Sequence, residues 1–356
     1  MKITTFPAAQ LSQEHWTAWS EVQRSEKEFD SPYFRPEFTQ AVAAVRNDVE
    51  VGVLEQAGEM VGFFPYQRAR GIARPVGGRL SDFQGVIVRR NVEWNLVELL
   101  KRCRLKAWHF DHAVSSQQKL HPYHRHVEDS PYADFSDGFT NYAAQHVQCG
   151  GDQFPNITEK ARKLERRIGP LRFEAETNDT QVFDTLLRWK QQQYVRSGAT
   201  NVFSFAWTRA VLERIFGCRE EAFAGTLCAL YAGEKLMAAH FGMRSYGVQH
   251  YWFPSYATEF AKFSPGMVRD LEFIKSLAAM GCRRLDFGKG MDQHKQYFMS
   301  GASQVAVGSV DLRPVRGIAQ RQWHRAYAWA RRSPLRKPAR VPARVLYRIR
   351  EWFAFQ

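Results

Sequence analysis

Short runs of alternating hydrophobic and polar positions are separated along the chain by amphipathic stretches with helical spacing. In the first third of the chain, this pattern predicts strands over 2–6, 49–55, 60–68 and 107–110, and helices over 13–21, 36–44 and 92–102. A hairpin turn, Ala57-Gly58-Glu59, joins two of the strands. Strands that alternate with helices in this way predict an α+β fold of mixed α/β layers.

The same order returns in the second half. Helices are predicted over 179–196, 207–216 and 265–280, and strands over 225–231, 235–244, 247–253 and 283–287. A second Ala-Gly-Glu turn, at 232–234, follows the first by 175 residues, and the same spacing separates Asp111 from Asp286. These matches predict a tandem repeat of one domain. Coincidence is the alternative, because Ala-Gly-Glu is an ordinary hairpin turn.

The stretch from Tyr251 to Tyr297 contains the motifs that best indicate a ligand-binding site. Its aromatic strand leads into a loop that ends in Ser264-Pro265-Gly266, where an amphipathic helix begins. A short strand follows and ends in Asp286-Phe287-Gly288-Lys289-Gly290. The free N–H groups and partial positive charge of a first helical turn favour an anion. Proline suits the start of such a helix, and glycine allows close approach to the backbone, so the stretch predicts a site for a phosphate-bearing ligand.

These motifs resemble the acyl-CoA N-acyltransferase (GNAT) superfamily, in the branch that includes the CelD/BcsL-like and FemAB-related transferases. The resemblance rests first on Ser264-Pro265-Gly266 and on Asp286-Phe287-Gly288-Lys289-Gly290 with Lys295. The hairpin at 227–243 and the segments 31–34 and 80–85 also contribute to it. The compact Arg/Gln-x-x-Gly-x-Gly/Ala signature of ordinary GNAT enzymes is absent. The resemblance implies tandem GNAT-like domains and an acyl-CoA co-substrate, acetyl-CoA or longer.

With the repeat, the resemblance divides the chain into four parts. We expect an N-terminal GNAT-like domain over 1–128, a linker with helices over 129–170, a C-terminal GNAT-like acyltransferase domain over 171–312, and a basic aromatic tail over 313–356. The second copy is expected to hold the cofactor. Where it has Ser264-Pro265-Gly266, the first copy has Arg89-Arg90-Asn91, without a glycine.

The GNAT arrangement implies roles for several side chains around this helix. The expected cofactor contacts are Trp252, Phe253, Lys262, Ser264, Gly266, Met267 and Arg269. The expected contacts to the acceptor are Asp82, Gln84, Lys289 and Tyr297, with Asp82 in the wall of a cleft between the two modules.

Three residues are candidates for the catalytic proton transfer. His240 lies in an apolar strand, and an unperturbed histidine pKa of about 6.5 suits proton transfer, although a core histidine is the alternative. Asp286 ends a strand beside a glycine loop, where a carboxylate acts as a base, orients an acceptor or caps the loop. Lys295 corresponds to a lysine of the FemAB-type pattern and looks like a contact to acceptor or phosphate. The histidines between 109 and 126 match no metal-ligand spacing, so no metal is expected.

Composition and charge limit the possible locations and partners. The five cysteines are scattered and odd in number, which favours a reducing, cytoplasmic compartment, and no apolar run reaches the length of a membrane span. Twelve basic residues lie between Arg313 and Arg350; with Glu351 they account for +11 of the net +14, which leaves +3 for residues 1–312. A nearly neutral body argues against nucleic acid as a partner. The tail is expected to dock on an anionic membrane surface; packing on the body or binding RNA are the alternatives.

The expected activity is transfer of an acyl group from acyl-CoA to an amine or hydroxyl of a sugar or an envelope or exopolysaccharide precursor. This would be N- or O-acylation by a cytoplasmic enzyme, with a peripheral position on the inner face of the membrane through the tail. One alternative is a FemAB-like transferase that uses aminoacyl-tRNA and acts on peptidoglycan precursors. The other is a catalytically inactive GNAT-fold scaffold in polysaccharide biosynthesis.

Overall fold

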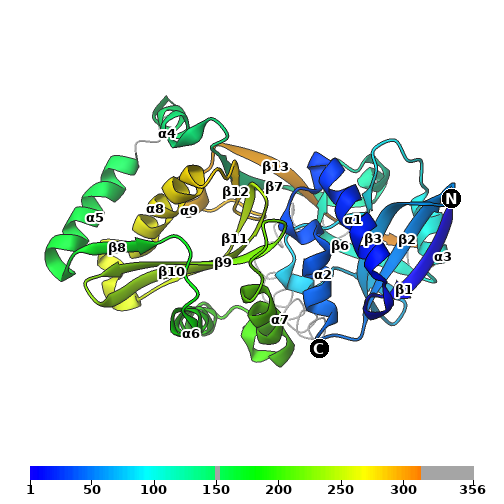
Figure 1. Cartoon of the computed structure of the whole chain (residues 1–356), viewed down its shortest axis with the longest axis horizontal. Coiled ribbons are helices and arrows are strands. Elements are labelled where there is room, and N and C mark those ends of the chain that lie inside the picture. Colours follow the sequence, from blue (N-terminus) through cyan, green and yellow to red (C-terminus); the bar gives the residue numbers. More distant parts are fainter. Residues whose placement is uncertain (149–152, 314–356) are drawn as a thin grey trace, which may run out of the picture.

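The computed structural model describes residues 1–148 and 153–313 (Figure 1). Its strands are β1 (Lys2–Pro7), β2 (Val49–Gln56), β3 (Glu59–Ala69), β4 (Ile72–Arg74), β5 (Ile87–Val88), β6 (Ala107–Val114), β7 (His124–Asp134), β8 (Leu171–Glu174), β9 (Ala224–Ala232), β10 (Lys235–Ser245), β11 (Val248–Tyr256), β12 (Arg284–Asp286) and β13 (Gly301–Asp311). Its α-helices are α1 (Gln13–Ser25), α2 (Pro36–Ala43), α3 (Leu96–Arg102), α4 (Gly138–Gln148), α5 (Phe154–Ile168), α6 (Thr180–Ser197), α7 (Ala206–Phe216), α8 (Pro265–Ala279) and α9 (Gln293–Gln296).

The described strands form one mixed sheet with a nearly palindromic order. Twelve of them follow the path β1-β2-β3-β4-β6-β13-β7-β12-β11-β10-β9-β8, and β5 pairs with β3. The pairs β4–β6 and β11–β12 are parallel, and the other neighbours on the path are antiparallel. Read from either end, the path passes through the same succession of elements, so the predicted tandem α+β repeat is confirmed.

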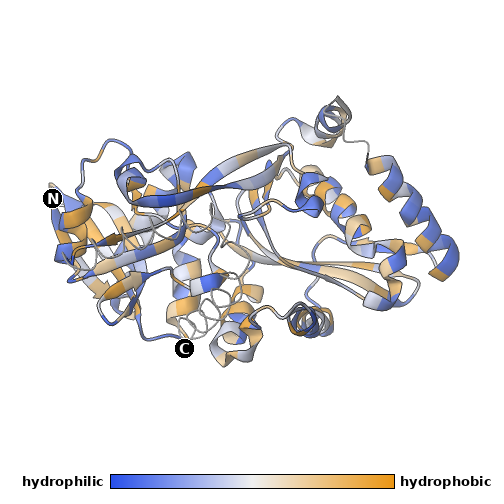
Figure 2. Ribbon diagram, turned by 180° about the vertical axis from the view of Figure 1, so that it is seen from behind, coloured by the Kyte–Doolittle hydropathy of each residue, from blue (hydrophilic) through white to orange (hydrophobic). Residues whose placement is uncertain are grey.

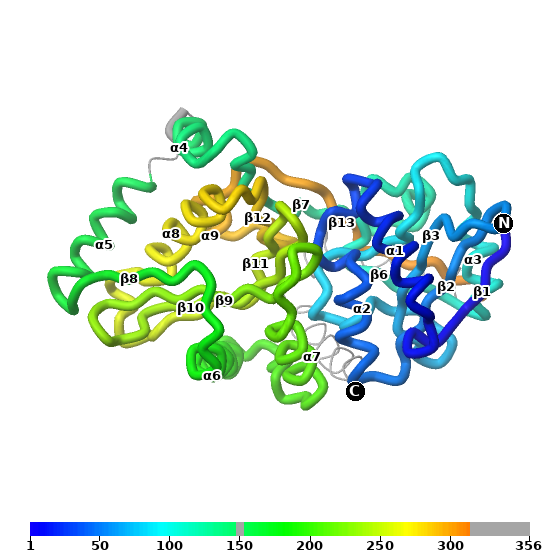
Figure 3. Tube along the Cα trace, in the orientation of Figure 1, coloured from blue at the N-terminus to red at the C-terminus, as the bar shows by residue number. Residues whose placement is uncertain are grey.

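The two modules exchange their last strands at the centre of this sheet. Strand β7, from the first half of the chain, pairs with β12 of the second module, and β13 pairs with β6 of the first. Strands β7 and β13 also pair with each other, and they run side by side between the two halves in Figure 3. The 175-residue spacing holds here as well. Tyr132 pairs with Gly301, and the residues 175 positions from these, Val307 and His126, pair with each other.

Helices cover both faces of the sheet. Helices α1, α2, α6 and α7 share one apolar core with one face across both modules, built on side chains such as Trp19, Phe38, Phe183 and Phe241. Helix α8 packs with α4, α5 and the opposite face of the second module, and α3 packs against the first module. Strands are mostly white to orange in Figure 2, whereas the outer helices carry long blue stretches. This distribution is expected when each helix buries one apolar side against a sheet.

The described part of the segment expected to be a linker with helices lies mostly in one strand and two helices. The expected boundary at residue 128 falls inside β7, and residues 129–170 contain the rest of β7 together with α4 and α5. Ser130-Pro131, a pair of residues typical of turns, lies within β7, where the Pro131 carbonyl accepts the Phe287 N–H at 2.9 Å. Helix α3 begins at Leu96 rather than at residue 92, because the Asn95 side chain accepts the Glu98 N–H and caps the helix there.

The expected tail lies outside the described residues beyond Arg313. Within the described ranges, none of the helices combines the length and the apolar character that crossing a bilayer requires.

The strand exchange predicts that the two modules unfold together. Ala306 is buried in β13 and pairs with Ala113 on β6 and with Val127 on β7. Proline there removes a backbone donor from the middle of the sheet and leaves a buried acceptor unpaired, so Ala306→Pro should cost about 1–3 kcal/mol from that loss alone. Urea unfolding followed by circular dichroism should show one transition at lower urea. Ala306→Gly, which keeps the N–H, is the control and should cost about 1 kcal/mol. Two separated transitions in the proline variant would contradict the role of β13.

Candidate functional site

The main cavity opens where β11 and β12 separate. These parallel strands pair only between Val248–His250 and Arg284–Asp286. Beyond His250, β11 continues to Tyr256 paired with β10 alone, so its edge toward β12 is unpaired. The cavity has a volume of about 640 Å³. It is lined by α6, by the free end of β11, by the 3-10 helix η7 (Thr258–Phe263), by the start of α8, by the segment 287–295 and by Asp82 of the first module.

A β-bulge shapes β11 beside the cavity. The pairing with β10 shifts between Phe241 and Met243, and a Cβ on Gly242 would lie 2.3 Å from the His250 carbonyl oxygen. Only glycine fits there. The Trp252 N–H donates to His240 Nε2 at 3.1 Å, so the histidine side chain takes the place of a ladder acceptor. His240 is fully buried, and burial, together with the Arg269 charge, lowers its pKa well below the usual value.

The N-terminus of α8 forms a second part of the cavity wall. Its N-cap, Ser264, has φ of 52° and makes no side-chain capping hydrogen bond, and the first turn carries no acidic residue. A Cβ on Gly266 would meet only Tyr256 Cδ1, at 3.5 Å. The corresponding helix of the first module differs, because Asn95 caps α3 and Glu98 lies in its first turn. The second module therefore keeps an open, positively polarised helix end, which suits an anion.

Arg269 fixes this helix to the strands. Its guanidinium donates to the carbonyls of Ala239 on β10 and Ser255 on β11, at 2.7 and 3.1 Å, and pairs with Asp270 at 2.5 Å. Burial alone would raise the pKa of Asp270, but Arg269 and His294 hold it at about 2. The Arg269 side chain is buried and its donors are engaged, so it positions the start of α8 within the site.

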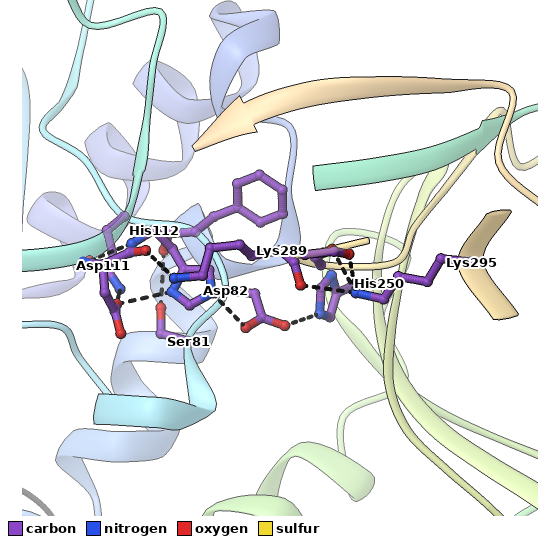
Figure 4. Close-up of polar contacts among 11 residues, drawn as sticks. Ser81, Asp82, Asp111, His112, His250, Lys289 and Lys295 are labelled. Atoms are coloured by element: carbon purple, nitrogen blue, oxygen red, sulfur yellow. Dashed lines mark hydrogen bonds and ion pairs between the residues drawn. The ribbon is translucent and has the colours of Figure 1, made fainter. Parts of the chain in front are cut away.

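A chain of acidic and basic side chains crosses the junction between the modules (Figure 4). Asp82 lies between two imidazoles: His250 Nε2 of β11 is 3.0 Å away, and His112 Nε2 of β6 is 3.4 Å away. The other ring nitrogen of His112 lies 3.0 Å from the Asp111 carboxylate. Burial acts to raise the pKa of Asp82, but the His250 hydrogen bond and the neighbouring positive charges lower it overall. Asp82 is therefore ionised at neutral pH and lines the cavity.

The segment 288–290 brings the second module against this chain. Gly288 has φ of 72°, and a Cβ there would lie 2.7 Å from Asp82 Oδ2. Lys289 Nζ donates to the Asp111 carbonyl at 2.9 Å, across the junction. Lys295 Nζ donates to the carbonyls of Gly288, Lys289 and Gly290 at 2.9–3.1 Å. Lys289, within the turn, and Lys295, in α9, thus fix the turn at 288–290 through hydrogen bonds to backbone carbonyls.

Eight of the predicted site residues line the cavity, and six do not. Those in its wall are Asp82, Trp252, Ser264, Gly266, Met267, Arg269, Lys289 and Lys295. The other six, His240, Phe253, Lys262, Asp286, Gln84 and Tyr297, make other contacts. His240 is fully buried on β10, where it accepts the Trp252 N–H, and it does not reach the cavity.

The five remaining residues contact other side chains of the protein instead of the cavity. Phe253 is buried against Phe203, and the Lys262 ammonium lies 5.1 Å from the Phe263 ring. Asp286 is buried and pairs with Arg284 at 2.8 Å, which in turn pairs with Asp30 of the first module at 2.5 Å. Gln84 donates to Asp111 at 2.7 Å, and the Tyr297 hydroxyl accepts from Gln293 at 2.7 Å.

Sequence reasoning gave no role to His250, His112 or Asp270. His112, His250 and Asp82 lie in three separate parts of the chain, so no local spacing joins them. The sequence does contain an indication of a role for Asp270, because a charged Arg-Asp pair interrupts the apolar face of the helix that begins at Pro265. Within residues 1–148 and 153–313 there is no group of three or more His, Cys, Asp or Glu side chains suited to a metal ion.

Comparisons with known proteins agree with this architecture. Residues 152–296 match the model of the acetyltransferase (GNAT) domain. A search of curated proteins gave no match. Among solved structures, FemX is 10% identical in sequence and superposes with a TM-score of 0.61, over 90% of this chain and 99% of FemX.

Two further structures share the fold at 10% identity. The C-terminal domain of a protein assigned as a lysylphosphatidylglycerol synthetase, from Agrobacterium fabrum, gives a TM-score of 0.53 and covers 87% of this chain and 94% of that domain. A tandem GNAT protein from the clavulanic acid biosynthesis pathway gives 0.50, over 88% and 99%. The chain thus has a tandem GNAT fold, and its second module carries the match to the GNAT acetyltransferase domain.

Proposed function

We propose that the protein is an acyltransferase that moves an acyl group from acyl-CoA to an amine or hydroxyl of an acceptor bound between the modules. The observation that carries this proposal is a single cavity lined by the open N-terminus of α8, by the unpaired edge of β11 and by the Asp82 carboxylate. These three features match the three needs of acyl transfer: to bind the phosphates, to admit the thioester arm, and to take a proton from the acceptor.

The residues present fit the CoA moiety. Ser264, Gly266 and Met267 would hold the pyrophosphate at the uncapped start of α8, and the splayed edge of β11 would receive the pantetheine arm. When bound, acyl-CoA supplies an activated acyl carbon. The separate GNAT-type match of residues 152–296 supports the choice of acyl-CoA over aminoacyl-tRNA.

Asp82 is the group proposed to receive the acceptor proton. As the acceptor nitrogen or oxygen bonds to the acyl carbon, it becomes acidic and releases a proton, and the sulfur leaves with the electron pair of the broken thioester bond. Asp82 is ionised and lines the cavity, whereas His240 and Asp286 are engaged behind its wall. His250 and His112 hold both carboxylate oxygens of Asp82 and fix their direction.

The wider role proposed is modification of a sugar or an envelope or exopolysaccharide precursor. This proposal follows the resemblance to the CelD/BcsL-like and FemAB-related branch. FemAB-like transfer to peptidoglycan precursors and an inactive scaffold remain the competing outcomes of the experiments below. A cytoplasmic location is proposed from the scattered cysteines, and a peripheral position at the membrane from the tail sequence.

Binding of acetyl-CoA tests the proposed cofactor site. Calorimetry should detect binding to the wild-type protein, and Gly266→Val should weaken it at least tenfold, because the branched side chain projects toward the cavity from an otherwise open position. The cost to the helix should be a few tenths of a kcal/mol, roughly. Ala279→Val, exposed at the far end of α8, is the control and should bind normally. If the folded wild-type protein binds no acyl-CoA of any chain length, the acyltransferase proposal is wrong.

Substitution of Asp82 tests the proton acceptor. Asp82→Asn keeps the size of the side chain but removes its charge, so turnover should fall by roughly 10²–10⁴-fold. Thiol release from acetyl-CoA in the presence of acceptor mixtures measures it. Asp137→Asn, which changes an exposed carboxylate outside the cavity, should leave turnover unchanged. Equal activity of the Asp82 variant and wild type would remove Asp82 from the mechanism.

His240 should affect stability rather than protonation. His240→Leu leaves the Trp252 N–H without its acceptor and should cost about 1–3 kcal/mol, whereas His240→Gln keeps an acceptor and should cost less. Because its pKa lies well below the usual value, His240 stays neutral above pH 6.5 and should contribute no step to the rate between pH 6.5 and 8. An acid limb in the wild-type pH profile that disappears in His240→Gln would instead identify it as the base.

A further inference from the structure

The cavity continues past β11 to a wall that the proposed CoA site does not use. This wall is helix α6, where Lys190, Gln193 and Arg196 line the cavity from successive turns on one side of the helix. Lys190 is half-buried, and its Nζ donates to the Pro254 carbonyl of β11 at 3.2 Å. The ammonium therefore lies at the free edge of β11, beside the point where the strands separate.

The α6 wall and the start of α8 lie on opposite faces of the sheet. Helix α6 packs on the face that carries Ala239 and Phe253, whereas α8 packs on the face that carries Ala238 and Tyr251. Figure 1 shows the two helices on either side of β9 and β10. Ala238 and Ala239 are neighbours on β10 and therefore point to opposite faces. Tyr251 and Phe253 divide between the two cores because the bulge in β11 lies between them. An anion at the α8 terminus and an anion at Lys190 would therefore occupy different ends of the cavity.

The cavity has more positive charge than its own acids neutralise. Its wall contains three carboxylates, Asp82, Asp270 and Asp292. The first two pair with imidazole or guanidinium groups, and Asp292 caps α9 through the Lys295 N–H.

Four other cations of the wall have no such partner in the part of the chain that the structure describes. Within residues 1–148 and 153–313, no carboxylate lies within ion-pair distance of Lys190, Arg196, Lys289 or Lys295. Burial, with the nearby Arg269 charge, lowers the pKa of Lys190 to about 8, as expected for an ammonium that has lost water and gained no counter-charge. Placing such a group in a cavity is costly unless a ligand supplies the negative charge.

We infer that the acceptor carries an anionic group, a phosphate or a carboxylate, which Lys190 binds at the α6 end of the cavity with Arg196 at its rim. This inference rests on the proposed acyltransferase function and names the substrate class of the same site. Asp82 lines the same cavity from the first module, so the anionic group would anchor the acceptor while its amine or hydroxyl faces the carboxylate. An anchored acceptor gains the entropic advantage of fixed orientation.

The experiment is calorimetric titration of small dianions into the protein already saturated with CoA. CoA fills the phosphate site at α8, so any further binding reports a second site. Inorganic phosphate and malonate are the two probes, and they distinguish a preference for phosphate from one for carboxylate. At least one should bind to the CoA-saturated wild type, and Lys190→Met should weaken that binding about 10- to 100-fold while leaving CoA affinity within about twofold.

Matched variants separate this site from general charge effects. Lys101→Met removes an exposed ammonium on α3 and should not change dianion binding. Arg196→Met, at an exposed position, should weaken it less than Lys190→Met does, and it provides the test if the Lys190 variant does not fold.

Three results would overturn the inference: neither dianion binds once CoA is present, Lys190→Met and Arg196→Met bind as wild type does, or Lys190→Met weakens CoA itself by tenfold. Failure of CoA to bind at all would instead reject the acyltransferase proposal.

Discussion

The pairing of β7 with β13 is the constraint on which the rest of the structure depends. Each strand completes the sheet of the other half of the chain, so the modules share one hydrogen-bonded ladder instead of a flexible connection. This ladder fixes the loop that carries Asp82 against the turn at Gly288, where no side chain would fit. The ion pairs from Asp30 to Arg283 and Arg284 lie across the same junction. A site divided between two modules needs such rigidity, because small displacements are costly in catalysis.

Polar groups behind the cavity maintain its shape at some energetic cost. The fully buried Arg269–Asp270 pair gains only if hydrogen bonds satisfy both charges, and the carbonyls of β10 and β11 and the Tyr251 hydroxyl do so. His240 acts similarly for the backbone, since it accepts the N–H that the bulge in β11 removes from the ladder. In a sequence, such residues resemble catalytic residues because they are polar and lie in apolar segments. Here they hold the strand edge and the helix start in place.

Much of the fold followed from periodicity, and the site only in part. The repeated strands and helices and their 175-residue spacing are local patterns, and the structure contains them. The exchanged strand β7 was missed because Ser130-Pro131 has the composition of a turn, and its pairing is long-range. Asp286 looked available for catalysis, but Arg284, two residues away on the same side of the strand, occupies it. The partners of Asp82 come from elements distant in sequence, and only the tertiary fold brings them together.

The difference between the two helix ends shows how a duplicated domain can divide its work. In the first module α3 is capped by Asn95, while in the second α8 is left open. If the proposed function is right, the first copy does not bind the nucleotide, and it contributes Asp82 to the wall of its neighbour's cavity. Under the proposed function, recognition of the acceptor and recognition of CoA are encoded in separate halves of the chain. Evolution could then change the acceptor through one copy while the other, under constraint from a universal cofactor, stays the same.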